Sequence, residues 1–288
     1  MAIALLRYGA YPLVMGLSIA AVLWIASSWQ WAWPGFAVTA VIALTVIATL
    51  ERVIPYQRAW QLDHGDLAAD IVHAAVNFSL LGGSAFALHA LGLDAVSVWP
   101  DAWPLWAQIL LAGAVMDLGL YLMHRASHRV GLLWRLHAIH HAPERLYWLN
   151  GERRHPLSAL VLAGPGLIVV VALGAPPLVV SAWLTLLAIH LGFQHANVDY
   201  RVGPLRYVLG VAEIHRWHHK REYEDAQVNF GEFWMIWDHL GRTFHDQPNG
   251  VIAGEVGLRD QRVPDDYGGQ LRWPFTQRDA RSDSLSRP

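Results

Sequence analysis

Six long apolar runs restrict how this chain can fold. They lie at 8–27, 34–50, 71–93, 105–123, 157–174 and 177–193. A helix needs roughly 20 apolar residues to cross the hydrocarbon core of a bilayer. Only 15% of the 288 residues are charged and 54% are hydrophobic, whereas soluble globular proteins carry about 25% charged residues. Because backbone exposed to lipid must form its hydrogen bonds within its own element, the runs predict an all-α, polytopic membrane bundle.

The distribution of charged and aromatic residues predicts how the bundle is oriented. If all six runs cross, every one of the 21 Lys and Arg residues falls on one side, and the opposite loops near 28–33, 94–104 and 174–176 have none. The positive-inside rule makes the basic side cytoplasmic, most simply that of a bacterial inner membrane. The opposite loops instead carry the tryptophans of an interfacial belt. These are Trp29, Trp31, Trp33, Trp99, Trp103 and Trp106.

Two of the six runs are interrupted. The third holds Gly82 and Gly83, and the fifth holds Gly164-Pro165-Gly166. Glycine and proline weaken or kink helices, so either run could be bent or re-entrant rather than fully crossing.

Composition excludes several kinds of chemistry. The net charge is −2 and there is no basic block, which argues against nucleic acid as a partner. Cysteine is absent, so disulfides, thiolate metal sites, iron–sulfur clusters and a cysteine nucleophile are excluded. Any redox chemistry must therefore come from a histidine-bound metal or from an outside partner.

The chain is expected to form one membrane-embedded domain over residues 1–250, with a polar tail at 251–288. The tail is rich in Gly and Pro, and it ends in DARSDSLSRP, a composition typical of partial disorder.

Ten of the 16 histidines form one pattern of blocks, HxxxH, HxxHH, HxxxxH and HxxHH. They are His124, His128, His137, His140, His141, His190, His195, His215, His218 and His219. Residues three or four apart share a helix face, so each block can direct its imidazoles at a common point. Neutral imidazole is a frequent ligand of transition metals, and ten are too many for one ion. The pattern predicts a two-metal centre in a histidine-rich helical cap at the cytoplasmic ends of the spans.

The blocks differ in how strongly they indicate metal. The pair His124 and His128 alone would more simply be a polar helix end, and it lacks the glutamate of a zinc-protease HExxH motif. Two HxxHH blocks at the same membrane depth are hard to obtain by chance. The pair His190 and His195 is five residues apart and does not share a regular helix face, so a buried structural histidine is a fair alternative for either.

The histidine spacing, together with four shorter elements, resembles the fatty acid hydroxylase/sterol desaturase superfamily of membrane di-iron enzymes. The elements are Arg154-His155-Pro156, His195-Ala196-Asn197, Asn229-Phe230-Gly231 and Trp237-Asp238. The resemblance covers about 105–247. It departs from the family after Trp237-Asp238, where this chain reads HLGRTFH and adds His239 and His245.

The resemblance implies a bundle of membrane helices capped on the cytoplasmic side. It implies two iron ions as cofactor, dioxygen as co-substrate, and hydroxylation, desaturation or cleavage of a membrane lipid such as a sterol, fatty acyl chain or alkylglycerol. The ten histidines named above are the implied ligands, and no catalytic residue separate from them is expected. Since no haem-binding, flavin or iron–sulfur motif is evident in the chain, a ferredoxin, cytochrome or reductase must supply electrons.

Ligating imidazoles usually donate their second N–H to a carboxylate or a carbonyl. Candidates for such supporting roles are Asp117, His155, Asn197, Asp199 and Glu213. Asp117 lies two turns before His124 on the same helix face, although a plain packing role is about as probable for it. His155 matches a family histidine outside the ligand spacings, which favours a structural role.

Two other function classes compete with an oxygenase. A histidine-bound metal hydrolase would need a carboxylate near an open metal position, and both the missing HExxH motif and the excess of ligands argue against it. A metal or proton transporter, or a bis-histidine haem carrier, would place its histidines near mid-membrane. Here most of them lie at one membrane face.

Overall fold

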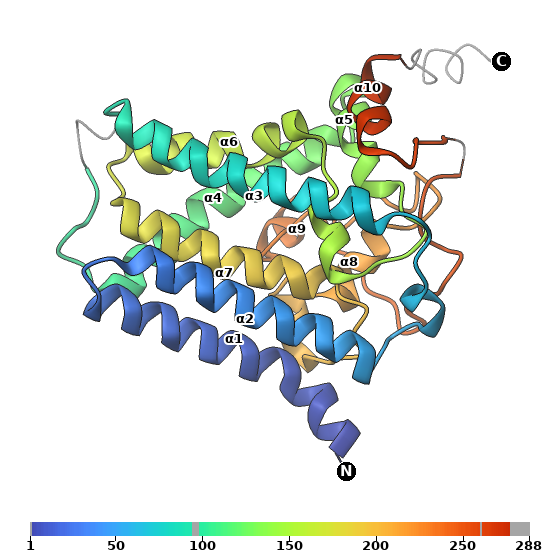
Figure 1. Ribbon diagram of the computed structural model, residues 1–288, viewed down its shortest axis with the longest axis horizontal. Coiled ribbons are helices and arrows are strands. Elements are labelled where there is room, and N and C mark those ends of the chain that lie inside the picture. The colour runs from blue at the N-terminus through green and yellow to red at the C-terminus, as the bar shows by residue number, and fades with distance from the viewer. Residues whose placement is uncertain (1, 94–97, 260, 277–288) are drawn as a thin grey trace.

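The computed structural model describes residues 2–93, 98–259 and 261–276, and within these ranges the regular structure is helical (Figure 1). The long helices are α1 (Ala2–Ser28), α2 (Ala32–Val53), α3 (Leu67–Ala90), α4 (Leu105–Ser127), α6 (Pro156–Ala172) and α7 (Pro177–His195). The shorter elements are η1 (Arg58–Gln61), α5 (Gly131–His141), η2 (Trp148–Glu152), η3 (Gly203–Tyr207), α8 (Ala212–His218), α9 (Ile236–Gly241) and α10 (Tyr267–Thr276).

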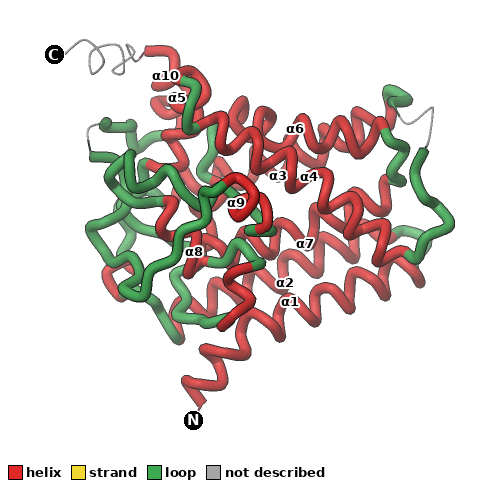
Figure 2. The backbone as a smooth tube through the Cα atoms, turned by 180° about the vertical axis from the view of Figure 1, so that it is seen from behind, coloured by secondary structure: helices red, strands yellow, loops and turns green. Residues whose placement is uncertain are grey.

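The six long helices lie side by side and form the bundle (Figure 1). The α1–α2 and α6–α7 connections are at one end of it, together with the C-terminal end of α3 and the N-terminal end of α4. The other end carries the histidine cap, by which we mean the short helices and loops of residues 128–155 and 196–259 (Figure 2). The all-helical bundle with a histidine-rich cap is therefore confirmed.

Five of the six expected spans are helices long and apolar enough to cross a membrane, namely α1, α2, α3, α4 and α7. The third run is one continuous helix through Gly82 and Gly83. The expected span at 157–174 differs, because α6 is apolar but only 17 residues long and has Pro165 inside it. A helix of this length falls short of the roughly 20 residues that a full crossing takes.

Small residues let the central helices approach closely. A Cβ placed on Gly119 of α4 would lie 2.8 Å from the backbone of Gly166 in α6, and one on Gly113 would lie 2.6 Å from the ring of Trp183 in α7. Close backbone approach at glycine is a common way for membrane helices to pack, because lipid provides no hydrophobic force that would drive them together. The glycines thus fix the position of α4, which carries His124.

The outer surface of the bundle remains apolar. Large side chains such as Leu17, Trp24, Val41 and Phe86 are exposed on it, as expected of helices that face lipid. Five of the six tryptophans expected at the interface opposite the cap are also exposed, whereas Trp99 is buried and donates to Gln108.

Buried charged groups attach the cap to the bundle. Arg145 donates to both carboxylate oxygens of Asp66, at 2.5 and 3.1 Å, immediately before α3. The carboxylate of Glu51 in α2 accepts the backbone N–H groups of Trp148 (2.7 Å) and Asn197 (2.8 Å). These contacts fix η2 and the segment after α7 over the end of the bundle.

Part of the expected tail also packs on the cap. In α10, Trp273 is buried against Trp134 and Ile139 of α5, and Gln270 lies 2.6 Å from the ring of His73. Residues 260 and 277–288 lie outside the described residues.

Candidate metal centre

Four segments bring their histidines together under the cap. His124 lies in the last turn of α4 and His128 caps that helix. Helix α5 carries the first HxxHH block at its C-terminal end, and α8 with the residue after it carries the second. His195 is the last residue of α7.

Nine of the ten predicted ligands form two buried clusters, and within each cluster the candidate ligand atoms lie within 4.8 Å of one another. Cluster 1 consists of His124, His128, His137, His141 and His218, and cluster 2 of His140, His195, His215 and His219. All nine side chains are at most 2% exposed. The clusters adjoin, since the rings of His141 and His219 stack with centroids 4.5 Å apart.

Each HxxHH block contributes to both clusters. His137 and His141 of α5 belong to cluster 1 and His140 to cluster 2. The second block is divided the other way round, so that His218 alone joins cluster 1. Since residues four apart in a helix differ by about 40° in direction and residues three apart by about 60° in the opposite sense, the outer pair of each block can share one ion while the middle histidine reaches the other.

The nitrogens in cluster 1 are arranged as ligands around a common point. The Nε2 atom of His141 lies 3.1 Å from Nε2 of His128 and 3.1 Å from Nε2 of His137. Two nitrogens bound to one ion at about 2.1 Å lie roughly 3.0–3.4 Å apart. The spacing therefore matches that of nitrogens that share an ion.

Two members of cluster 1 are oriented by backbone carbonyls. Nδ1 of His124 donates to the carbonyl of Phe230 (2.9 Å), and Nδ1 of His218 donates to that of Val228 (2.8 Å). Their buried Nε2 atoms have no hydrogen-bond partner among the described residues. This tautomer directs an Nε2 lone pair into the cluster, as a metal ligand requires.

Cluster 2 has the same construction. Nε2 of His215 lies 3.0 Å from Nε2 of His195 and 3.0 Å from Nε2 of His219. Nδ1 of His195 lies 3.3 Å from the side-chain oxygen of Asn150 in η2. The donor set in both clusters is neutral nitrogen, which suits iron, zinc, copper or nickel and does not suit magnesium or calcium.

Burial keeps the imidazoles in the ligand form. It lowers the pKa of His137, His140, His141, His215 and His219 well below the ordinary value of 6.5, and neighbouring imidazoles lower it further. These rings are consequently neutral near pH 7, with a free lone pair for a metal ion.

The structure does not bring His190 to either cluster. Its Nδ1 is 2.8 Å from the hydroxyl of Tyr11, its Nε2 donates to the carbonyl of Glu232 (3.1 Å), and its ring stacks on Phe233. The five-residue spacing to His195 rotates the two side chains about 140° apart on α7, so that only His195 faces the centre.

The predicted supporting residues hold segments of the cap, and among the described residues none of them forms a hydrogen bond or ion pair with a cluster histidine. Asp117 accepts hydrogen bonds from the backbone of Phe233 (2.8 Å) and Trp234 (3.1 Å) and from the indole of Trp237 (2.8 Å). It thereby attaches residues 233–237 to α4. Asp117 cannot also act as the hydrogen-bond partner of His124, whose Nδ1 is directed at Phe230.

His155 and Asn197 have similar roles. His155 caps α6, because its Nδ1 accepts the N–H of Leu157 (3.1 Å) while Nε2 donates to the carbonyl of Leu271 (3.2 Å). The side chain of Asn197 forms two hydrogen bonds, 2.8 and 2.9 Å, with the backbone of Gln57.

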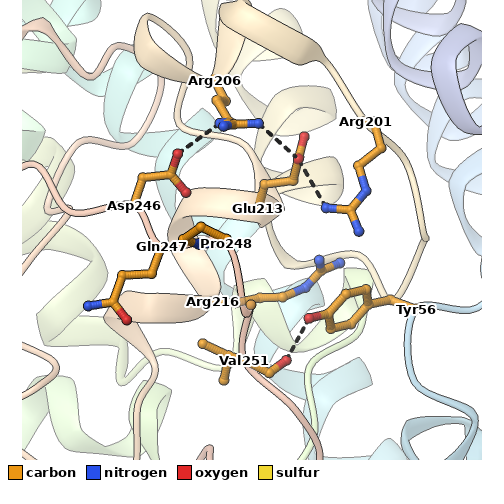
Figure 3. Close-up of a pocket in the computed structure, with 10 residues that line it drawn as sticks. Tyr56, Arg201, Arg206, Glu213, Arg216, Asp246, Gln247, Pro248 and Val251 are labelled. Atoms are coloured by element: carbon orange, nitrogen blue, oxygen red, sulfur yellow. Dashed lines mark hydrogen bonds and ion pairs between the residues drawn. The ribbon is translucent and has the colours of Figure 1, made fainter.

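Glu213 lines a polar pocket of about 70 Å³ (Figure 3). Its carboxylate is 3.2 Å from Arg201 and 4.0 Å from Arg206, and it accepts the N–H of Val202. Asp199 forms an ion pair with Arg7. Neither carboxylate contacts a cluster histidine through a hydrogen bond or ion pair among the described residues.

Sequence reasoning missed three side chains that contact the cluster histidines or the backbone that orients them. Glu232 lies 3.3 Å from Nδ1 of His124, Asn150 lies beside His195, and Asp238 binds the N–H groups of Phe230 and Gly231 at 2.8 and 2.7 Å. Asp238 was part of a recognised motif and could have been found. The other two have no spacing relation to the histidines.

The extra histidines of this chain lie outside both clusters. The ring of His239 donates to the carbonyl of Tyr207 (2.8 Å) and stacks on Phe244, and the ring of His245 packs edge-on against Trp217.

Comparison with known proteins places the site in a family context. The sequence model described as "Fatty acid hydroxylase" matches residues 109–243, which include all nine cluster histidines. The ornithine lipid hydroxylase OlsE of Rhizobium tropici is 34% identical over 255 residues, which is 84% of this chain and 76% of the relative.

More distant relatives share the same region. The alkylglycerol monooxygenase of Homo sapiens is 28% identical over 159 residues, 54% of this chain and 34% of the relative. Methylsterol monooxygenase 1 of Danio rerio is 26% identical over 152 residues, 52% of this chain and 50% of the relative. No solved structure matches the chain. The match to the first relative covers most of both chains, and the family model spans all nine cluster histidines. The chain therefore belongs to the fatty acid hydroxylase family.

Proposed function

We propose that this chain is a membrane-bound lipid hydroxylase that uses two histidine-bound iron ions, dioxygen and electrons from a separate protein. The observation that carries the proposal is the pair of adjoining, fully buried histidine clusters at one end of a bundle of membrane helices. Four histidines lie close together in the smaller cluster and five in the larger. This donor set is sufficient for two ions.

The two iron ions would be held by the nine cluster histidines. When bound, they would supply the activation of dioxygen that oxidation of an unactivated C–H bond requires. The protein's part is to keep nine neutral rings oriented and buried. The carbonyls of Phe230 and Val228 set the direction of two of those rings, and the burial of the clusters keeps bulk water away.

The position of the clusters supports a substrate that enters from the bilayer and a donor that binds outside it. Large apolar side chains are exposed on the long helices, whereas the cluster histidines lie at the ends of α4 and α7 and in the short helices of the cap. We place this cap on the cytoplasmic side because all Lys and Arg residues fall at that end of the predicted spans. A cytoplasmic ferredoxin, cytochrome or reductase would then dock on the cap.

The relatives support a lipid with a polar headgroup and hydroxylation as the reaction. Their names specify ornithine lipid, alkylglycerol and methylsterol, and each name is that of a hydroxylase or a monooxygenase. We therefore favour the addition of one oxygen atom over desaturation. A histidine-bound metal hydrolase is disfavoured, since none of these relatives is named as one and no HExxH motif is present.

Lipid extracts from cells with and without the gene, grown under ¹⁸O₂, test the proposal. We expect a lipid that gains one ¹⁸O atom only in cells that carry the gene. A loss of two hydrogens would indicate desaturation, and a lipid change that proceeds without dioxygen would indicate the hydrolase. The purified protein should contain about two irons per chain and show no haem absorbance.

A further inference from the structure

A buried arginine and a buried glutamate face one another beside the histidine clusters. From their geometry we infer that Arg154 and Glu232 bind a lipid headgroup that carries both a carboxylate and an ammonium group. The inference rests on the proposed function and specifies its substrate class.

Glu232 adjoins cluster 1. Its Oε1 atom is 3.3 Å from Nδ1 of His124, and its backbone carbonyl accepts hydrogen bonds from His190 (3.1 Å) and Gln194 (2.8 Å) of α7. The residue is 1% exposed. It is not among the candidate ligands of either cluster, and it contacts His124 on the side of the ring opposite Nε2. Its Oε2 atom is buried and has no hydrogen-bond partner among the described residues.

Arg154 approaches from the side of cluster 2. Its Nε atom donates to the carbonyl of Gly151 (3.0 Å), and Gly151 packs so closely on His195 that a Cβ there would lie 3.1 Å from the ring. The side chain of Arg154 is buried, and its Nη2 atom is 3.9 Å from Oε2 of Glu232. Arg154 is thus linked to cluster 2 through Gly151, and Glu232 adjoins cluster 1 at His124.

The pair does not have the geometry of a structural salt bridge. Buried arginine–carboxylate pairs usually form hydrogen bonds of about 2.7–2.9 Å, and in this cap Arg145 donates two hydrogen bonds to Asp66, at 2.5 and 3.1 Å. By contrast, the facing atoms Nη2 of Arg154 and Oε2 of Glu232 are both buried and neither has a hydrogen-bond partner among the described residues. Buried charges left in this way are costly, whereas a ligand with two opposite charges would satisfy both.

Neighbouring polar groups favour the same ligand. The side-chain oxygens of Gln194 and Asn77 are buried and lack hydrogen-bond partners in the described structure, although the amide groups of both residues donate to backbone carbonyls near Glu232 or Arg154. They are two more buried acceptors on residues that bond to the backbone of the pair. A plain alkyl chain or a sterol ring would cover all these groups without forming hydrogen bonds to them, which is unfavourable.

Four synthetic lipids with one acyl chain test the contribution of each headgroup charge to binding. Nα-lauroyl-ornithine carries a carboxylate and an ammonium, its methyl ester only the ammonium, Nα-lauroyl-norvaline only the carboxylate, and the norvaline methyl ester neither. Binding is measured on the full chain in nanodiscs loaded with zinc, which is redox-inert. We expect the doubly charged lipid to bind at least about tenfold more tightly than the neutral one, because it forms two charge-assisted hydrogen bonds more.

Two variants assign each charge to its partner. Arg154→Gln should bind lipids with and without a carboxylate equally well but still bind lipids with an ammonium group more tightly. Glu232→Gln should lose the preference for an ammonium group and keep the preference for a carboxylate. The matched controls Arg58→Gln and Glu224→Gln lie at exposed positions and should retain both preferences. Zinc content and thermal unfolding establish that each variant is folded.

The comparison of the four lipids on the unaltered protein needs no variant. Equal binding of all four would overturn the inference, as would variants that weaken all four equally. If the zinc-loaded protein selects the doubly charged lipid but the iron-loaded protein oxidises nothing, the proposed function fails and the headgroup site stands. If the iron-loaded protein oxidises a lipid but the zinc-loaded protein selects none of the four, the headgroup site fails and the proposed function stands.

Discussion

Gly119 of α4 and Gly166 of α6 hold their two helices in backbone contact. A Cβ on Gly119 would lie 2.8 Å from both N and Cα of Gly166, and these are backbone atoms that cannot rotate away. His124 follows one and a half turns later on α4. The contact therefore links helix packing in the bundle to the position of a cluster 1 ring.

Gly119→Ala should push α4 away from α6 and displace His124. We expect a loss of about 1–3 kcal/mol in stability, as is typical of overpacking, and a reduced iron content. Thermal unfolding and elemental analysis measure the two effects. Gly164→Ala is the matched control on α6, because a Cβ there meets nothing within 4 Å. Equal behaviour of the two variants would mean that the close contact does not position the site.

The division of each HxxHH block makes a prediction about single ligands. His141→Ala should remove a ligand from cluster 1 and His140→Ala one from cluster 2, although the residues are adjacent. Each variant should keep about one iron of two, and Mössbauer spectra of the remaining iron should differ between them. Identical spectra would argue against two separate sites within one block.

His190 provides a test of which histidines bind metal. Because both of its ring nitrogens have protein partners, His190→Ala should leave the iron content near two per chain. The variant should unfold at a lower temperature, since it leaves the buried hydroxyl of Tyr11 without a partner at a cost of about 1–3 kcal/mol. Loss of an iron comparable to that in His195→Ala would make His190 a ligand.

Local spacing predicted the site better than it predicted the contacts around it. Runs of apolar residues located the spans, and i, i+3 and i+4 spacing grouped eight of the nine cluster imidazoles, because both signals depend on one helix at a time. The five-residue spacing of His190 and His195 was ambiguous, because residues five apart do not share a regular helix face. Helix geometry lets only one of them face the centre.

Contacts between distant segments could not be predicted. Asp117 shares a helix face with His124, but it binds backbone 116 and 117 residues away. Glu232 and Arg154 come together from two loops that meet only in the fold. Such pairings depend on the packing of several elements, for which a single sequence has no periodic signal.

Asp117 should be a strong determinant of stability. Its carboxylate accepts three hydrogen bonds from the segment 233–237. Asp117→Asn keeps the shape but replaces one acceptor oxygen by a donor, which would face N–H groups. We expect a loss of about 2–3 kcal/mol and weaker binding of the cluster 1 iron, since Phe230 and Glu232 precede this segment. Asp101→Asn, at an exposed position, is the control for thermal unfolding. An unchanged unfolding temperature would refute the role.

The ion pair of Asp66 and Arg145 should make stability depend on acid pH. Burial alone would raise the pKa of Asp66, but the hydrogen bonds and positive charge of Arg145 outweigh it, and the pKa is lowered from 3.8. A carboxyl with a lower pKa in the folded state contributes stability that is complete above the unfolded pKa and is lost as pH falls through the folded one. Asp66→Asn should therefore unfold well below the wild-type temperature at pH 7.

The difference between the two proteins should narrow as pH is lowered from about 5 to 3, because the wild-type carboxyl becomes protonated. At neutral pH we expect a loss of about 3 kcal/mol, since Arg145 would be left buried without its main anionic partner. Asp63→Asn removes a contact of 3.3 Å with the same arginine at an exposed position, and it should cost less than about 1 kcal/mol. A difference between wild type and Asp66→Asn that stays constant from pH 7 to 3 would show that the charge of Asp66 is not what attaches the cap to α3.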